Sequence, residues 1–224
     1  MSNISPIDGR YKKNVSELET FFSEQALMRH RVMVEVEYLL ALIEHRSFQK
    51  TRALSKKTLN SLKGLYVEFS ADHFKQIKKI EKKTNHDVNA VVVFVSEKLK
   101  KLGRGDLVPF VHFGLTSEDI NNISYSLMTQ GAVECVMIPS VKRVLKELKA
   151  LSKKTKSLSL LSLTHGQPAT TTTLGKELAV FVSRVEREIA LIKKMKLLAK
   201  LSGATGSYAC LLYTSPSPRD VLRS

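Results

Sequence analysis

Three short polar segments interrupt long apolar stretches of the chain, and they hold side chains capable of acid–base or anion-binding chemistry. They are Thr84–Asp87, Thr116–Asn122 and Thr164–Thr170. His86 and His165 lie in the first and third segments, and histidine can exchange a proton near neutral pH without a large pKa shift. Each segment alone also fits a structural role in a turn or at a helix start. Catalysis would require that the fold bring them together.

The segment around His165 lies between two long helical patterns. The preceding residues 158–163 are largely apolar, and residues 174–198 after it have helical periodicity. Gly166 lets the backbone pass close to a ligand, and Pro168 prevents a continuous helix. The pattern predicts a tight connection that holds an imidazole at the end of a helical bundle.

The other two segments are predicted to lie at helix starts. Thr116 and Ser117 precede two acidic residues, which is a strong signal for the start of a helix that should run to about Val136. Asp87 is the predicted N-cap of the next apolar segment, Val88–Leu99. Its run of valines also suits a strand, but the flanking residues favour a buried helix.

The remaining pattern predicts further helices. We expect one helix from an N-cap at Ser16 to about His45, a break at 47–55, and helices at 56–70 and 71–83. A heptad pattern then predicts a helix that packs along a partner, through Met137, Val141, Val144, Leu148 and Leu151. A similar pattern follows Thr173. Two such helices joined through the His165 turn predict an antiparallel bundle, so the expected fold class is all-α.

Composition restricts the kind of protein. The chain of 224 residues is long enough for one large or two modest domains. Its net charge of +15 comes mainly from lysines spread along the sequence, and aromatic residues make up only 7%. This favours a solvated lysine-rich surface over nucleic-acid binding, although a basic helical protein that binds nucleic acid or an acidic partner remains the non-enzyme alternative.

The cysteines and the apolar runs bear on location. Cys135 and Cys210 are too far apart for a metal or redox motif, which favours a reducing, cytoplasmic setting. No apolar run approaches the roughly 20 residues that a membrane span needs, and Met1–Arg10 is not a secretory signal. We therefore expect no membrane association.

With a fourth polar segment, Asp8–Tyr11, the polar segments closely resemble the adenylosuccinate lyases, the purine-biosynthesis members of the aspartase/fumarase superfamily. The resemblance runs from the N-terminus to about Ala209. The matching residues are Ser5–Tyr11, Thr84–Val88, Phe113, Thr116–Asn122, Thr164–Thr170 and Gly175–Glu177. Argininosuccinate lyases and fumarases, the alternative enzymes, typically have Thr-His-Leu-Gln around the histidine, whereas this chain has Thr-His-Gly-Gln.

The resemblance implies a β-elimination that releases fumarate from adenylosuccinate and from a succinylated aminoimidazole carboxamide ribotide. It implies no metal and no organic cofactor, because hydrogen-bond donors stabilise the developing charge. His165 would be the general acid that protonates the leaving nitrogen. The implied substrate-binding residues are Arg10 and Tyr11 for the phosphate, Asn85, His86 and Asp87 beside the substrate, and Thr116 and Ser117 for a carboxylate. Ser117 could also be a plain N-cap.

One departure from the family pattern matters. The family's general base is a serine on a mobile loop well downstream of the histidine, and this sequence contains no such loop. We therefore expect an inactive N-terminal portion of a homotetrameric enzyme. The expected parts are an N-terminal helical domain at 1–112 and a truncated aspartase/fumarase-type central bundle at 113–209. Residues 210–224 resemble translated library adaptor and are expected to be foreign and disordered.

Overall fold

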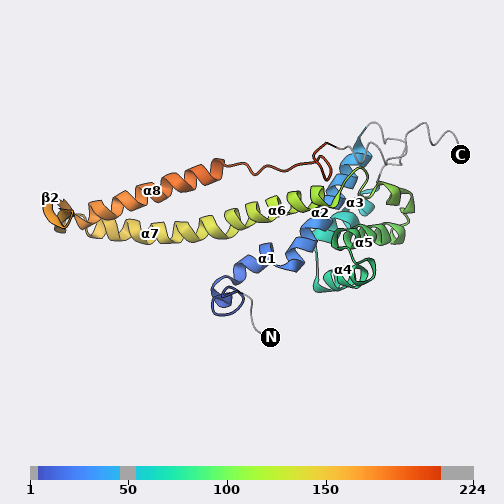
Figure 1. Cartoon of the computed structure of the whole chain (residues 1–224), viewed down its shortest axis with the longest axis horizontal. Coiled ribbons are helices and arrows are strands. Elements are labelled where there is room, and N and C mark those ends of the chain that lie inside the picture. Colours follow the sequence, from blue (N-terminus) through green and yellow to red (C-terminus); the bar gives the residue numbers. More distant parts are fainter. Residues whose placement is uncertain (1–4, 46–53, 208–224) are drawn as a thin grey trace. The chain divides into compact units, whose positions relative to one another are not determined.

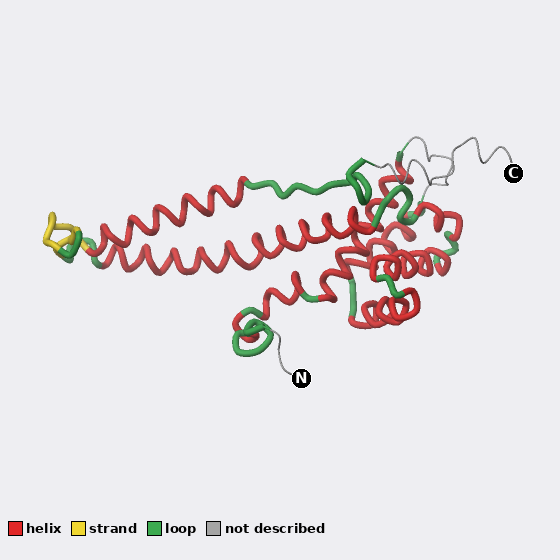
Figure 2. The backbone as a smooth tube through the Cα atoms, in the orientation of Figure 1, coloured by secondary structure: helices red, strands yellow, loops and turns green. Residues whose placement is uncertain are grey.

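The computed structural model describes residues 5–45 and 54–207 and is mainly helical (Figures 1 and 2). The chain forms two compact units. The first comprises Met1–Thr129 together with Leu198–Ser224, and the second comprises Gln130–Leu197. The all-α class is confirmed, with one small two-stranded sheet in the second unit. The predicted division at 112/113 remains a prediction, and the predicted foreign tail lies outside the described residues.

Helices form the first unit. It begins with 3₁₀ helices at Lys12–Asn14 and Ser16–Leu18. The α-helices are α1 (Glu19–Phe22), α2 (Glu24–Glu44), α3 (Lys56–Val67), α4 (Ala71–Thr84), α5 (Asp87–Lys101) and α6 (Ser117–Ala132), with a 3₁₀ helix at Gly105–Phe110 before α6. The predicted start of the first long helix at Ser16 is wrong. Ser23 is extended and its hydroxyl accepts the N–H of Ala26, so this serine caps α2.

The core of the first unit lies where α2 packs against α3, α4 and α5. Its largest fully buried apolar side chains include Met28, Leu39, Leu62, Ile77, Phe94 and Leu99. The valine-rich segment is the buried helix α5, as predicted, because burial on one helical face satisfies its apolar residues without a sheet. Its N-cap, however, is His86 and not Asp87.

The second unit is a helical pair joined by a hairpin. A π-helical turn at Val133–Met137 leads into α7 (Ile138–Lys154). Strands β1 (Ser159–Thr164) and β2 (Gln167–Thr173) follow, and then α8 (Leu174–Lys194), which packs against α7. The expected helix end near Val136 is therefore a π turn. Pro139 explains it, because its ring and missing N–H disturb regular α-helical bonding to the preceding turn.

The connection that carries His165 is an antiparallel β-hairpin, not a simple loop between helices. Thr164 pairs with Gln167, so His165 and Gly166 form a two-residue turn. Both have positive φ, 52° and 73°, as a type I′ turn requires. The polar Thr170–Thr173 run forms most of β2, where β-branched residues are favourable.

The predicted heptad on α7 is largely exposed within the second unit. Val144 and Leu151 keep 59% and 45% of their surface accessible, whereas Leu145 is buried. The face of α7 that is buried in this unit is therefore offset from the heptad. Among the described residues, no helix combines the length and the apolar character that crossing a membrane would need.

Candidate active site

Two of the polar segments meet in the first unit. Asn85 ends α4 in the left-handed conformation, with φ 50°, and turns the chain directly into α5. His86 then caps α5, where its Nδ1 accepts the N–H of Asn89 at 3.2 Å. A neutral imidazole with an accepting Nδ1 carries its proton on Nε2. This Nε2 lies 3.5 Å from the Ser117 hydroxyl at the start of α6.

A surface cleft borders the His86 turn. Its volume is about 560 Å³. The lining residues are Lys78, Glu81, Lys82, Asn85, His86 and Asp87. It therefore contains three consecutive predicted site residues beside two lysines and Glu81, and Lys78 is ion-paired with Glu24 and Glu81.

Arg31, a buried residue of α2, connects the His86 segment to the Ser117 segment. Its side chain is 3% exposed, and its Nη2 lies 2.7 Å from Oδ2 of Asp87. Its Nε donates to Oδ1 of Asn121 in α6 at 2.9 Å. One buried guanidinium thus bonds to both the His86 segment and the Ser117 segment. Arg31 is not among the site residues predicted from the sequence, although an arginine among apolar helix positions is a signal that could have identified it.

Asp87 is occupied by these structural contacts. Its Oδ1 accepts the N–H of Val88 at 2.8 Å, while Oδ2 faces Arg31. Burial raises the pKa of Asp87, but the charge of Arg31 and the Val88 N–H outweigh that effect, so the pKa is lowered. Asp87 is therefore an ionised acceptor near neutral pH.

A second buried pair supports the loop before Thr116. Glu35 on α2 is fully buried, and its Oε1 lies 2.5 Å from Nδ1 of His112. His112 has a positive φ of 61°. The Tyr38 hydroxyl, one turn along α2 from Glu35, donates to the carbonyl of Phe113. The segment that leads to Thr116 is thus fixed to α2 by two side chains.

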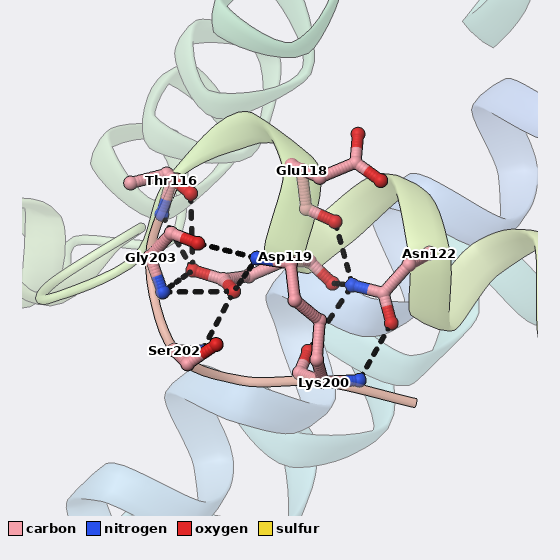
Figure 3. Close-up of polar contacts among 7 residues, drawn as sticks. All are labelled: Thr116, Glu118, Asp119, Asn122, Lys200, Ser202 and Gly203. Atoms are coloured by element: carbon pink, nitrogen blue, oxygen red, sulfur yellow. Dashed lines mark hydrogen bonds and ion pairs between the residues drawn. The ribbon is translucent and has the colours of Figure 1, made fainter. Parts of the chain in front are cut away.

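Asp119 organises the beginning of α6 (Figure 3). Its side chain is fully buried and accepts both the N–H and the hydroxyl of Thr116, at 3.0 and 3.1 Å. The Thr116 hydroxyl is therefore a donor to Asp119. The first N–H groups of a helix have no acceptor within the helix, and they carry partial positive charge. Ser117 adds a hydroxyl at this end.

Arg10 and Tyr11 lie in the hydrogen-bonded turns before α1. The Arg10 guanidinium stacks 5.6 Å from the centre of the Tyr11 ring, which is 47% exposed. Within the described residues, neither side chain hydrogen-bonds to His86 or Ser117. The structure thus keeps the pair exposed and available, but it does not join it to the His86 site.

His165 is described within the second unit alone. It is exposed at the hairpin turn, and its Nδ1 lies 3.2 Å from the Thr164 hydroxyl. The base of the hairpin is tightly packed. Gly175 donates to the carbonyl of Thr155, and a Cβ at this glycine would lie 2.4 Å from the carbonyl oxygen of Ser152. Only glycine permits this approach of α7 and α8.

The structure thus joins His86 to Ser117 and packs Asn85, Asp87 and Thr116 around them. In residues 5–45 and 54–207, no group of three or more His, Cys, Asp or Glu side chains is arranged to hold a metal ion. At this site the carboxylate of Asp87 is paired with Arg31 and the Val88 N–H, and the imidazole of His86 with the Asn89 N–H. This arrangement can bind an anion and exchange a proton.

Comparison with known proteins places these observations in a family. The profile of the family described as Lyase matches residues 9–220, which includes part of the segment predicted to be foreign. The chain is 40% identical to adenylosuccinate lyase from Buchnera aphidicola subsp. Schizaphis graminum over 219 residues, covering 96% of this chain and 48% of that protein. It is 42% identical to adenylosuccinate lyase from Dictyostelium discoideum, covering 92% and 46%. The chain spans about half the length of these relatives.

Solved structures share the fold. A fumarate lyase from Mesorhizobium sp. BNC1 has a TM-score of 0.66 at 20% identity, over 93% of this chain and 46% of that chain. The β-carboxy-cis,cis-muconate cycloisomerase from Acinetobacter calcoaceticus has a TM-score of 0.62 at 22% identity, over 88% and 44%. The prediction that this chain forms the first part of such a helical fold is confirmed.

Proposed function

The chain belongs to the lyase family, and we propose that it is the N-terminal portion of an enzyme that releases fumarate from adenylosuccinate. The observation that carries this proposal is the similarity of about 40% to adenylosuccinate lyases over nearly the whole chain. The same enzyme would act on the succinylated aminoimidazole carboxamide ribotide. The proposal gives a role to polar side chains at two helix starts, His86 and Ser117, and to His165 at a hairpin turn.

The reaction needs two proton transfers and an anion site. A base removes a proton from the carbon beside a carboxylate, which leaves a carbanion with aci-carboxylate character. The C–N bond then breaks, and an acid delivers a proton to the departing nitrogen. We assign the acid role to His165, because an exposed imidazole at a hairpin tip can reach a ligand and a protonated imidazole can deliver a proton to nitrogen.

The start of α6 is the proposed site for a substrate carboxylate. Ser117 supplies a hydroxyl and the first helical N–H. Thr116 directly precedes it and is held in place by its two hydrogen bonds to Asp119. His86 donates from Nε2 toward Ser117 and can orient a bound carboxylate in the same way. Asn85 lines the adjacent cleft, and Asp87 acts there mainly by holding Arg31.

The exposed pair Arg10 and Tyr11 is proposed to bind the nucleotide phosphate. Arginine offers a planar fork of permanent donors that matches phosphate oxygens. Its stacking on the Tyr11 ring limits the positions of the guanidinium before substrate arrives.

The complete enzyme is proposed to be a homotetramer. The exposed apolar heptad of α7 supports this, because such a stripe favours packing against another helix. The catalytic base would come from a serine loop beyond this portion of the enzyme. The 224-residue chain should therefore show no turnover.

Fumarate release is the direct test. The purified chain is incubated with adenylosuccinate, and fumarate is quantified by chromatography. The same assay is run on the chain extended by the natural coding sequence that follows Ala209, with argininosuccinate as a control substrate. We expect release only by the extended chain and only from the succinylated nucleotides. Release from argininosuccinate instead would assign another substrate, and normal turnover by the short chain would refute its incompleteness.

A further inference from the structure

The fully buried carboxylate of Asp119 on α6 accepts hydrogen bonds from the segment 200–203, about 80 residues away in the sequence. Oδ1 of Asp119 accepts the ammonium of Lys200 at 3.1 Å and the N–H of Ser202 at 3.0 Å. The N–H of Gly203 donates to both oxygens at 3.2 Å. Together with Thr116, four residues donate to one side chain (Figure 3). Burying an ionised carboxylate is unfavourable unless its oxygens are satisfied in this way.

Two further side chains of α6 hold the same segment. Oδ1 of Asn122 accepts the N–H of Lys200 at 2.8 Å, and its amide donates to the Lys200 carbonyl at 3.1 Å. The Ser126 hydroxyl donates to the carbonyl of Leu198. Residues 119, 122 and 126 are spaced by three and four, so they lie on one face of the helix. The segment 198–203 therefore runs along this face toward the helix start.

The contacts at Asp119 place Gly203 beside the proposed carboxylate site. Gly203 and Thr116 both donate N–H groups to Oδ2 of Asp119, and Thr116 directly precedes Ser117. Gly203 has a φ of 73°, a conformation that suits glycine. The Gly203 carbonyl also accepts a hydrogen bond from the Lys200 ammonium, so this side chain links the two ends of the turn 200–203.

We propose that Asp119 is a positioning residue that uses its charge to hold the turn 200–203 and Thr116 together, so that this turn forms a second wall of the site at the start of α6. The assignment of that site to a substrate carboxylate rests on the proposed function. The turn itself is absent from the set of site residues that the sequence suggested. Asp119 contributes without contacting substrate, because its oxygens are filled by protein donors.

Glycine-selective ¹⁵N labelling of the 224-residue chain tests the proposal, since the chain has only 10 glycines. We compare Asp119→Asn with Glu118→Gln, which removes one carboxylate from the neighbouring exposed position. In Asp119→Asn, the Gly203 amide resonance should shift strongly, and tryptic cleavage after Lys200 should be at least about tenfold faster. Glu118→Gln should leave both unchanged. Asp119→Asn behaviour identical to the wild type would overturn the proposal.

A second measurement needs no substitution and covers the case in which Asp119→Asn does not fold. The Gly203 amide of the wild-type chain is followed as pH falls, with Lys200 as the charged group that faces Asp119 and Glu118 as the neighbouring acid. We expect one titration step in this resonance, below the usual carboxyl range. If the Gly203 resonance showed no pH-dependent change in chemical shift before global unfolding, the proposed link between Asp119 and the turn 200–203 would be overturned. Either result is independent of fumarate release, so failure of the proposed reaction remains distinguishable.

Discussion

Arg31 and Asp87 lie 2.7 Å apart, and the arginine is almost fully buried while the aspartate is 44% exposed. The pair connects α2, in the core, to the residue that follows His86. The buried cation also reaches Asn121, one turn after Ser117. The distance between the two proposed substrate-binding segments is therefore set by one side chain in the core of the first unit.

Removal of the aspartate should be costly, because it leaves a buried charge without its partner. We expect Asp87→Ala to lower the free energy of unfolding by about 3 kcal/mol. The control is Asp72→Ala, which removes an exposed aspartate 3.7 Å from Lys75 and should cost no more than about 1 kcal/mol. Urea unfolding of both variants measures the difference. Equal losses would show that burial of Arg31 has no energetic consequence.

His112 should matter more to stability than His165, although both have positive φ. His112→Ala leaves the fully buried Glu35 without its partner, and we expect a loss of about 3 kcal/mol. His165 is exposed, so His165→Ala should change stability by less than about 0.5 kcal/mol. Because backbone strain is similar at both positions, thermal unfolding of the two variants isolates the Glu35 contact. A small effect at both positions would contradict the argument.

The pKa values of Asp87 and Asp119 are both lowered in the folded chain. Burial raises the pKa of Asp119, but N–H donors from Thr116 and Ser202 and the Lys200 ammonium outweigh it. Lowered carboxyl pKa values stabilise the fold above the unfolded value of about 3.9, and this stability disappears as pH falls through the folded values. We therefore expect the urea concentration at the midpoint of unfolding, measured between pH 7 and pH 2, to decrease once the pH is below about 4. Asp119→Asn should flatten that decline.

Gly175 should be intolerant of a methyl group. A Cβ there would meet the Ser152 carbonyl and the Lys156 backbone at 2.4–2.7 Å, so α7 and α8 would have to separate. We expect Gly175→Ala to destabilise the second unit by more than about 1 kcal/mol. Gly64, inside α3, has no atom within 4 Å of such a Cβ, and Gly64→Ala should stabilise by about 0.5–1 kcal/mol. Hydrogen exchange in each helix would detect both changes; opposite signs are required.

Much of the fold could be predicted from local pattern. The boundaries of α4 and α5 agree with the prediction to within about two residues at each end, because caps and apolar spacing act over short distances. The N-cap at His86 was missed because a histidine nitrogen can replace the usual aspartate oxygen. The hairpin at His165 was also missed, since the glycine and proline around it are equally typical of a loop.

The supporting residues of the site could not be predicted in the same way. Arg31 and Asp119 bond to partners 56 and 84 residues away, and no local spacing encodes such pairs. The sequence does show two charged residues, Arg31 and Glu35, four positions apart among apolar helix positions, and this is unusual. The proposed site residues stand out in the sequence because they lie in polar segments between apolar stretches.

The extended chain tests the central claim most directly, by comparing wild type with His165→Asn in the release of fumarate from adenylosuccinate. Removal of a general acid typically costs about 10²- to 10⁴-fold in rate, and we expect a loss of kcat in this range. Circular dichroism should show an unchanged fold, because His165 is exposed at a hairpin turn. A His165→Asn enzyme that releases fumarate at the wild-type rate would contradict the account.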